Sequence, residues 1–464
     1  MPLIKKTLWW RRLLEMGLIY LCIEGIISLL FYEFKLTLLI KDVILGLAYM
    51  AFVGWVILRR PYLDWPRVLT LPLAAFVVLG IVQFFNPALE SLLVGLVGVR
   101  TRLFYIPLLL LGYFYLNKKH DLETLGLLLA LPSIPVNLLA ILQYLLGPER
   151  VAQWGTGFAV SIWSVGNFEG VPVYRPVATF SHTGHYAAYL LAITLVTAAF
   201  CNFSRTPARL WLFRITLALQ FAGIMVNGAR TTLLFVPLGV LLIWLLSILW
   251  RSWSGLGRIQ WRVLTVNLGM ILIGTFGGFI IAPTGLYRAQ SILAPSQPGQ
   301  LVTVDGERYD VKEQLNIFDV LRVSVQRLGR VDRQNLWRGY GLGSASPGTR
   351  YITATPDRFM GNGLFEGLMG QFIWEFGLSG LILFYLAWLS LLGWGAYNAF
   401  GLRDPLLQSI TVAIVLYHAF LFVTTGTYTL VAYAPTSVYF WLFLGLLMAL
   451  PRLERPEAEP AFYG

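Results

Sequence analysis

The sequence predicts an all-α membrane protein, a bundle of about twelve transmembrane helices. Two observations support this fold class. Apolar residues make up 57% of the 464 residues and charged residues only 12%, whereas an average soluble domain has about 25% charged residues. The apolar residues also gather into runs of roughly 20 residues, the length that a helix needs to cross a bilayer. A soluble protein is therefore excluded, and residues 1–464 are expected to form a single integral membrane domain.

The apolar runs define the expected spans in chain order. The fourth run is short, and the apolar stretch at 87–101 before it is either its beginning or a half-buried, re-entrant segment, so eleven to thirteen spans fit the sequence. The expected spans are 13–32, 38–58, 68–86, 103–117, 123–146, 182–201, 209–227, 230–250, 263–283, 371–396, 406–425 and 428–450.

A long connection, residues 284–370, separates the ninth expected span from the tenth. Apolar side chains recur at helical spacing within it, between residues 311 and 330, and charged residues stand between them. This pattern predicts an amphipathic helix that lies on the membrane face or caps the bundle. The connection is thus expected to be a large, partly helical loop, and long structured loops usually carry function.

The Lys and Arg residues predict the orientation of the chain. If the N-terminus is placed in the cytoplasm, eighteen of the 35 cations fall in inner segments and seven in short outer segments. Short cytoplasmic loops carry an excess of Lys and Arg, so both termini are expected in the cytoplasm. The remaining ten cations belong to the long connection, which is then extracytoplasmic, and long loops translocate regardless of charge.

Two outer segments place an arginine at the level of the lipid headgroups. Arg175 lies where the polar loop enters the sixth span, and Arg230 lies in a short turn at the outer end of two helices. The planar guanidinium fork matches the oxygens of a phosphate group. Two such groups can bind a lipid-linked pyrophosphate and stabilise the charge that it gains as it departs. The alternative is that both arginines only reach toward lipid headgroups.

Three further features have simpler interpretations. His182 and His185 lie one helical turn apart, but no carboxylate or third histidine accompanies them, which favours hydrogen bonding at the mouth of a site over metal binding. Glu375 lies in an apolar run, where a carboxylate is costly unless paired, so it pairs with an arginine or lines a cavity. The run Gly339-Tyr340-Gly341-Leu342-Gly343 lacks the strand and the lysine of a phosphate-binding loop and predicts a tight loop.

Together these segments resemble the O-antigen ligase and O-antigen polymerase superfamily of membrane glycosyltransferases. The resemblance covers residues from about 170 to 395 and, more loosely, the whole chain. It implies the class C-type glycosyltransferase architecture, in the inner membrane of a bacterium, with the active site facing the periplasm or exterior. The segments that carry it are RPVATFSHTGHYAAYL, NGARTTLLFVPLGVLL, GYGLG and GLFEGLMGQFIWEFGLSGLILF.

The family transfers a glycan from a polyprenyl pyrophosphate to an acceptor hydroxyl, without a cofactor or a required metal. Its essential arginines correspond by motif to Arg175 and Arg230. Ligases of the family place a histidine nine residues before the glutamate that corresponds to Glu375, and Glu366 stands at that position here. A carboxylate can take the acceptor proton, and glutamate at this position favours the polymerase-like branch. The alternative is that Glu366 is an exposed loop acid or lies near the start of the tenth span.

The resemblance therefore implies a polysaccharide polymerase of O-antigen, capsule or exopolysaccharide synthesis, with Glu366, Arg175 and Arg230 as catalytic residues. The implied partners are the lipid-linked oligosaccharide, membrane lipids, a flippase and a chain-length regulator, and no nucleic acid. One alternative is an O-antigen ligase that transfers a finished glycan to lipid A core or to protein. Another is a twelve-span transporter, which would show two similar six-span halves. The implied substrate-binding residues are Arg100, Arg102, Tyr174, His182, His185, Arg358 and Asn362.

Overall fold

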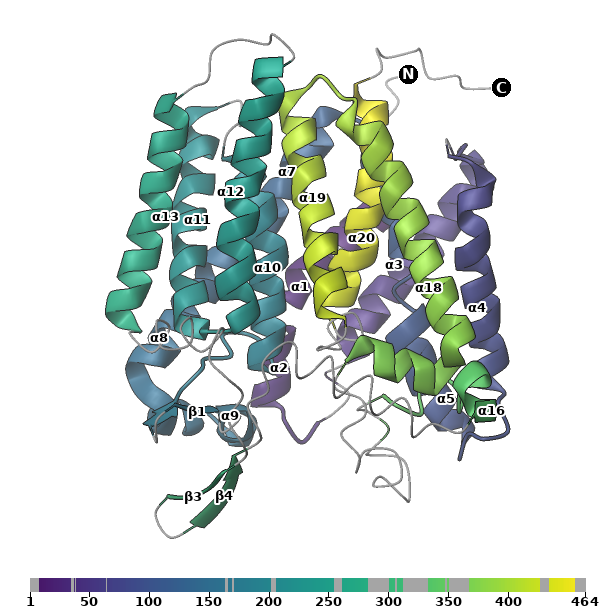
Figure 1. Ribbon diagram of the computed structural model, residues 1–464, viewed down its shortest axis with the longest axis horizontal. Helices are drawn as coiled ribbons and strands as arrows, with labels where there is room; N and C mark the ends of the chain where they lie inside the picture. Colours follow the sequence, from purple (N-terminus) through teal and green to yellow (C-terminus); the bar gives the residue numbers. More distant parts are fainter. Residues whose placement is uncertain are drawn as a thin grey trace.

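The computed structural model is a helical bundle with two short β-hairpins (Figure 1). Eleven helices among its described residues are long and apolar enough to cross a membrane, or up to twelve if one bent pair is counted as a span. The prediction of a polytopic helical bundle is confirmed, and the count lies within the predicted range. The described residues are 8–34, 37, 39–63, 65–162, 166–168, 171–201, 206–253, 261–282, 300–304, 307–311, 333–346, 349, 367–425 and 434–454.

The first expected span, 13–32, is a broken helix. Its two parts, α1 (Trp9–Leu21) and α2 (Glu24–Leu30), meet at an angle of 55°. The break places Glu24 at the start of α2, where its carboxylate pairs with Lys41 on α3 (Ile40–Arg59). A carboxylate among apolar helices is costly unless it is paired, so the bend places this charge beside its partner.

The fourth span consists of three pieces that together cover Leu92–Tyr115. They are α5 (Leu92–Gly98), the π-helical turn η3 (Val99–Leu103) and α6 (Leu108–Tyr115). The sequence allowed this span to begin before residue 103, and the structure begins it at Leu92. Turns of this kind often occur at functional sites, and this one contains both Arg100 and Arg102.

The other helices follow the predicted runs, with ends shifted by a few residues. The spans that remain are η2 (Arg67–Thr70) with α4 (Leu71–Phe84), α7 (Lys119–Ala130) with α8 (Ser133–Ala152), α10 (Thr183–Phe200), α11 (Pro207–Asn227), α12 (Arg230–Trp253), α13 (Trp261–Ile281), α18 (Leu368–Phe400), α19 (Pro405–Thr424) and α20 (Thr436–Ala449) with η6 (Leu450–Leu453). The short elements are α9 (Thr156–Ile162), α16 (Arg333–Arg338), and the hairpins of β1 (Gly166–Phe168) with β2 (Val171–Val173) and β3 (Gln300–Val304) with β4 (Glu307–Val311).

Most of the long connection at 284–370 lies outside the described residues. Its described parts include the β3–β4 hairpin, α16 and the glycine-containing loop 339–346. The amphipathic helix was predicted to begin at Val311, but Val311 is the last residue of β4. The rest of that predicted helix lies outside the described residues.

The bundle has two chemically distinct ends. At one end Arg11 of α1 donates to the carbonyl oxygen of Tyr115, and Arg452 of η6 donates to that of Leu116 at 3.1 Å. The start of α1 and η6 therefore both lie beside the end of α6. The other end carries α5, α9, α16 and the β1–β2 hairpin, and it includes the starts of α10 and α12 (Figure 1). We call this second end the hairpin end.

The centre of the bundle is formed by α10 and α20. In each of them 89% of the most apolar stretch is buried, compared with 17% in α13. The interior also contains polar contacts between helices. The hydroxyl of Tyr186 on α10 donates to Oδ1 of Asn137 on α8 at 2.6 Å. Both side chains are fully buried. Hydrogen bonds of this type help to hold transmembrane helices together where no water is available.

Removal of this contact is expected to loosen the bundle. Tyr186→Phe keeps the ring and leaves Oδ1 of Asn137 without its donor, so the free energy of unfolding should fall by about 1 kcal/mol. Tyr397→Phe is the matched control because the Tyr397 side chain is 78% exposed. Thermal unfolding of the two variants in detergent checks the prediction, and equal melting temperatures would contradict it.

Candidate functional site

The central helix α10 begins at the hairpin end with a histidine cap. His182 has an extended backbone conformation, and the backbone N–H of Gly184 donates to its Nδ1 at 3.0 Å. This contact gives an acceptor to one of the backbone N–H groups that have no partner within the helix at its start. Because Nδ1 is the acceptor, the neutral imidazole carries its proton on Nε2. The neutral ring of His182 therefore has its donor at Nε2.

The surroundings of His182 favour this neutral form. Partial burial lowers the pKa of His182, and the nearby charge of Arg175 lowers it further. The positive end of the α10 dipole acts in the same direction. His185 follows one turn later, with a centroid distance of 5.7 Å between the two rings, and its Nδ1 lies 3.3 Å from Oγ of Ser181. No group of three potential metal ligands occurs among the described residues.

Arg175 connects the segment before α10 to the end of α11. Its Nε donates to the backbone carbonyl oxygen of Asn227 at 2.9 Å, and its Nη2 donates to Oδ1 of the same residue at 3.4 Å. Asn227 is the last residue of α11, and α12 begins at Arg230. Nδ2 of Asn227 also donates to the carbonyl oxygen of Thr183, the first residue of α10. The two arginines predicted from separate motifs therefore lie at one turn of the chain.

Tyr174 lies beside Arg175 but faces apolar neighbours. Its side chain is 9% exposed and belongs to a small cluster with Leu29, Val151 and Phe158. Its ring stacks against Tyr144 with a centroid distance of 6.0 Å. Burial raises the pKa of the Tyr174 phenol, which keeps it neutral. The structure thus places Tyr174, which was predicted to bind substrate, in apolar packing with Phe158 of α9.

A second group of charged residues lies close to the histidines, and sequence reasoning missed part of it. Lys41 is 4% exposed, pairs with Glu24 and acts electrostatically on His185. Arg100 donates from Nε to Oδ2 of Asp42 at 2.6 Å. Counting the loop cations placed Lys41 on the outer side, but it could not show that α2 and α3 bring its amine beside the start of α10.

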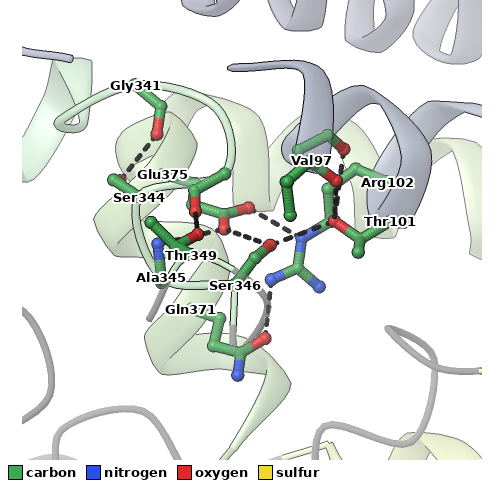
Figure 2. A network of polar contacts seen from close by, with 12 residues as sticks. Val97, Thr101, Arg102, Gly341, Ser344, Ala345, Ser346, Thr349, Gln371 and Glu375 are labelled. Carbon is green, nitrogen blue, oxygen red and sulfur yellow. Dashed lines mark hydrogen bonds and ion pairs between the residues drawn. The ribbon is translucent and has the colours of Figure 1, made fainter. Parts of the chain in front are cut away.

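Arg102 belongs to a separate buried network (Figure 2). Its Nε donates to Oε2 of Glu375 at 2.7 Å, and its Nη2 donates to Oε1 of Gln371 at 2.6 Å. The side chains of Arg102 and Glu375 are 1% and 0% exposed. Of the two interpretations of Glu375, a pair with an arginine or a place in a cavity wall, the structure shows the pair. The charge of Arg102, which was predicted to contact substrate, is balanced by this carboxylate.

The same carboxylate holds the glycine-containing loop. The backbone N–H of Ala345 and the hydroxyl of Ser346 each donate to Oε1 of Glu375 at 3.2 Å. Gly343 has φ of +87°, and a Cβ there would lie 2.1 Å from the carbonyl oxygen of Val94 on α5. Only glycine accepts both conditions without strain. The interpretation of this run as a tight loop is confirmed.

The loop and α18 also meet at a break in that helix. Gly377 has φ of +72°, which interrupts α18 two residues after Glu375. A Cβ on Gly377 would lie 2.1 Å from the carbonyl oxygen of Trp337. The backbone of α16 therefore approaches α18 at Gly377, the residue where the direction of α18 changes.

Three predicted site residues, Glu366, Arg358 and Asn362, lie outside the described residues. The structure brings Arg175, Arg230 and His182 together at the starts of α10 and α12, with His185 one turn further. It places Arg100 and Arg102 in two separate ion pairs.

No protein-family model matches the chain, and no curated protein matches it. The fold alone defines a multi-pass helical membrane protein. What the protein does must therefore be inferred from its own residues.

The cap of α10 can be tested through stability. His182→Ala removes the acceptor for Gly184 and should lower the melting temperature, whereas His182→Asn retains an acceptor because asparagine is a favoured N-cap. The pKa of His182 is lowered from 6.5 by folding, so the unfolded chain binds this proton more readily. Wild-type stability should then fall as the pH drops below 6.5.

The asparagine variant should lose less stability over the same pH interval, because it has no imidazole to protonate. Thermal unfolding in detergent on both sides of the histidine pKa measures this difference. An identical loss in the wild type and in His182→Asn would show that His182 is not the group responsible.

Proposed function

We propose that the chain is a membrane glycosyltransferase that extends a glycan carried on a polyprenyl pyrophosphate. The observation that carries the proposal is the meeting of Arg175 with Asn227, 52 residues further along the chain, at the turn from which Arg230 begins α12. Arginine is suited to bidentate contact with phosphate oxygens. A pair of arginines at one end of a multi-pass bundle fits a lipid-linked pyrophosphate better than a soluble substrate.

In this proposal the hairpin end faces the outside of the bacterial cytoplasmic membrane, where Arg175 and Arg230 hold the pyrophosphate. The bond between the anomeric carbon and the phosphate oxygen breaks, and the polyprenyl pyrophosphate leaves with the electron pair. Its charge grows as it departs, so fixed cations stabilise the transition state more than the ground state. The contacts of Arg175 with the oxygens of Asn227 orient its guanidinium.

The acceptor sugar supplies the new bond. Its hydroxyl oxygen attacks the anomeric carbon, and Glu366 accepts the hydroxyl proton as a general base. His182 is held as a neutral donor, so it is suited to donate a hydrogen bond to a substrate oxygen and unsuited to accept this proton at Nε2. The pathway partners implied by such a reaction are a flippase that delivers the lipid-linked unit and a regulator of chain length.

Replacement of the proposed catalytic groups should abolish extension. Arg175→Ala, Arg230→Ala and Glu366→Gln should each lower the rate by roughly 10²-fold or more. Arg59→Ala is the control, because Arg59 is an exposed cation at the last turn of α3. The assay is extension of a polyprenyl-pyrophosphate oligosaccharide by purified protein in proteoliposomes, with the products separated by length.

The products also separate the alternatives. A ladder of longer glycans on the carrier lipid supports a polymerase, whereas transfer to lipid A core or to protein indicates a ligase. Full activity of Glu366→Gln would eliminate Glu366 as the base. Solute uptake that survives Arg230→Ala, without any glycan product, would replace the proposal with a transporter.

A further inference from the structure

The turn between Arg175 and α10 contains a strained residue. Ala178 has φ of +53°, in the left-handed region that residues with a side chain rarely adopt. It is the second residue of the turn 177–180, which the backbone N–H of Phe180 closes by donating to the carbonyl oxygen of Val177 at 2.9 Å. Glycine, asparagine and aspartate are the usual residues where this position of a turn has positive φ. Alanine keeps such a conformation only where its surroundings hold it.

Gln143 of α8 holds Ala178 through both of its backbone polar groups. The N–H of Ala178 donates to Oε1 of Gln143 at 2.8 Å, and Nε2 of Gln143 donates to the carbonyl oxygen of Ala178 at 2.9 Å. Both residues are 0% exposed. The two bonds need a carbonyl acceptor and an N–H donor on one side-chain amide, so a methionine of similar length cannot replace them.

Helix α2 covers the same turn on another side. A Cβ on Gly25 would lie 2.2 Å from Cα of Phe180 and 2.3 Å from the carbonyl oxygen of Thr179. The backbone of α2 therefore packs directly against the turn 177–180. This contact limits where the turn can move, whereas the bonds to Gln143 set its backbone conformation.

The two flanks of the turn are tied to one residue of α11. Asn227 accepts from Arg175 on one side of the turn and donates to the carbonyl oxygen of Thr183 on the other. A change in the shape of the turn would therefore displace Arg175 or Thr183 from Asn227. Displacement by about 1 Å of a group that acts on the reacting atoms can lower a rate by roughly 10²-fold.

We propose that Gln143 is a positioning residue, which holds the turn 177–180 and thereby the guanidinium of Arg175 at the end of α11. Gln143 does not contact the substrate in this inference. Its effect on catalysis rests on the proposed function, in which Arg175 holds the pyrophosphate. Its effect on the turn does not depend on any reaction.

Hydrogen exchange tests the hold on the turn without an enzymatic assay. Gln143→Met removes both hydrogen bonds to Ala178, so the backbone N–H groups of the turn should exchange about tenfold faster than in the wild type. The measurement is mass spectrometry of the peptide that covers residues 176–182, with the full chain in detergent. Unchanged exchange in this peptide would overturn the inference.

The matched control is Gln220→Met on α11. Gln220 is also 0% exposed, and its Nε2 donates to Oγ of Ser133 at 2.9 Å and to Oγ1 of Thr197 at 3.1 Å. This substitution removes a buried amide and two hydrogen bonds, as Gln143→Met does, so the melting temperature should fall in both variants. Exchange in the turn should rise in Gln143→Met alone. An equal rise in the control would mean that the whole bundle loosens, which contradicts a specific hold by Gln143.

The kinetics of glycan extension test the effect on Arg175. The kcat of Gln143→Met should be roughly 10²-fold low, whereas Gln220→Met should keep the wild-type kcat below its melting temperature. Ala178→Gly added to Gln143→Met should restore part of the lost kcat, because glycine adopts positive φ without a steric cost. A loss caused only by poorer packing at position 143 would not respond to a substitution at position 178.

The outcomes distinguish this inference from the proposed function. Normal kcat in Gln143→Met, or a loss that Ala178→Gly does not reduce, would overturn the positioning role. A wild-type protein that extends no glycan would refute the proposed function instead. Hydrogen exchange would then still decide whether Gln143 holds the turn.

Discussion

The structure depends on one constraint, which is that a charge inside a membrane bundle must find a counter-charge or hydrogen-bond partners within the protein. Among the described residues of the hairpin end, ion pairs meet it between Lys41 and Glu24, between Arg100 and Asp42 and between Arg102 and Glu375. The partners are 17, 58 and 273 residues apart in the chain. Each pair is therefore also a tertiary contact, and together they determine how the broken first span, the π-helical turn and α18 assemble.

The same constraint distinguishes the arginines from one another. Arg100 and Arg102 have carboxylates as partners, so their charge is balanced within the fold. The contacts of Arg175 with Asn227 are made to a backbone carbonyl and a side-chain amide oxygen, which orient a guanidinium but carry no formal charge. From the sequence, Arg175 was expected at the outer headgroup level, and the family resemblance implied that Arg100 and Arg102 bind substrate. Their carboxylate partners give Arg100 and Arg102 a part in organising the bundle.

The sequence predicted the features that depend on local composition. Apolar runs located the spans, and the cost of a lone carboxylate in an apolar run predicted that Glu375 is paired. The identity of its partner could not be predicted, because Arg102 lies in a different span and helical periodicity reports only which face of a helix is buried. The bend before Glu24 and the position of Lys41 were missed for the same reason. Both depend on which helices are neighbours, and that is a property of the assembled bundle.

Two systems of contacts at the hairpin end differ in physical character. Arg175 donates hydrogen bonds to the uncharged oxygens of Asn227, which is tied in turn to Thr183 at the start of α10, the buried central helix. The fourth span, the glycine-containing loop and α18 are joined through the buried ion pair of Arg102 and Glu375. Loss of Asn227 removes hydrogen bonds, whereas loss of Arg102 leaves a buried carboxylate without its partner. The contacts around Glu375 are therefore expected to tolerate single substitutions less well than those around Asn227.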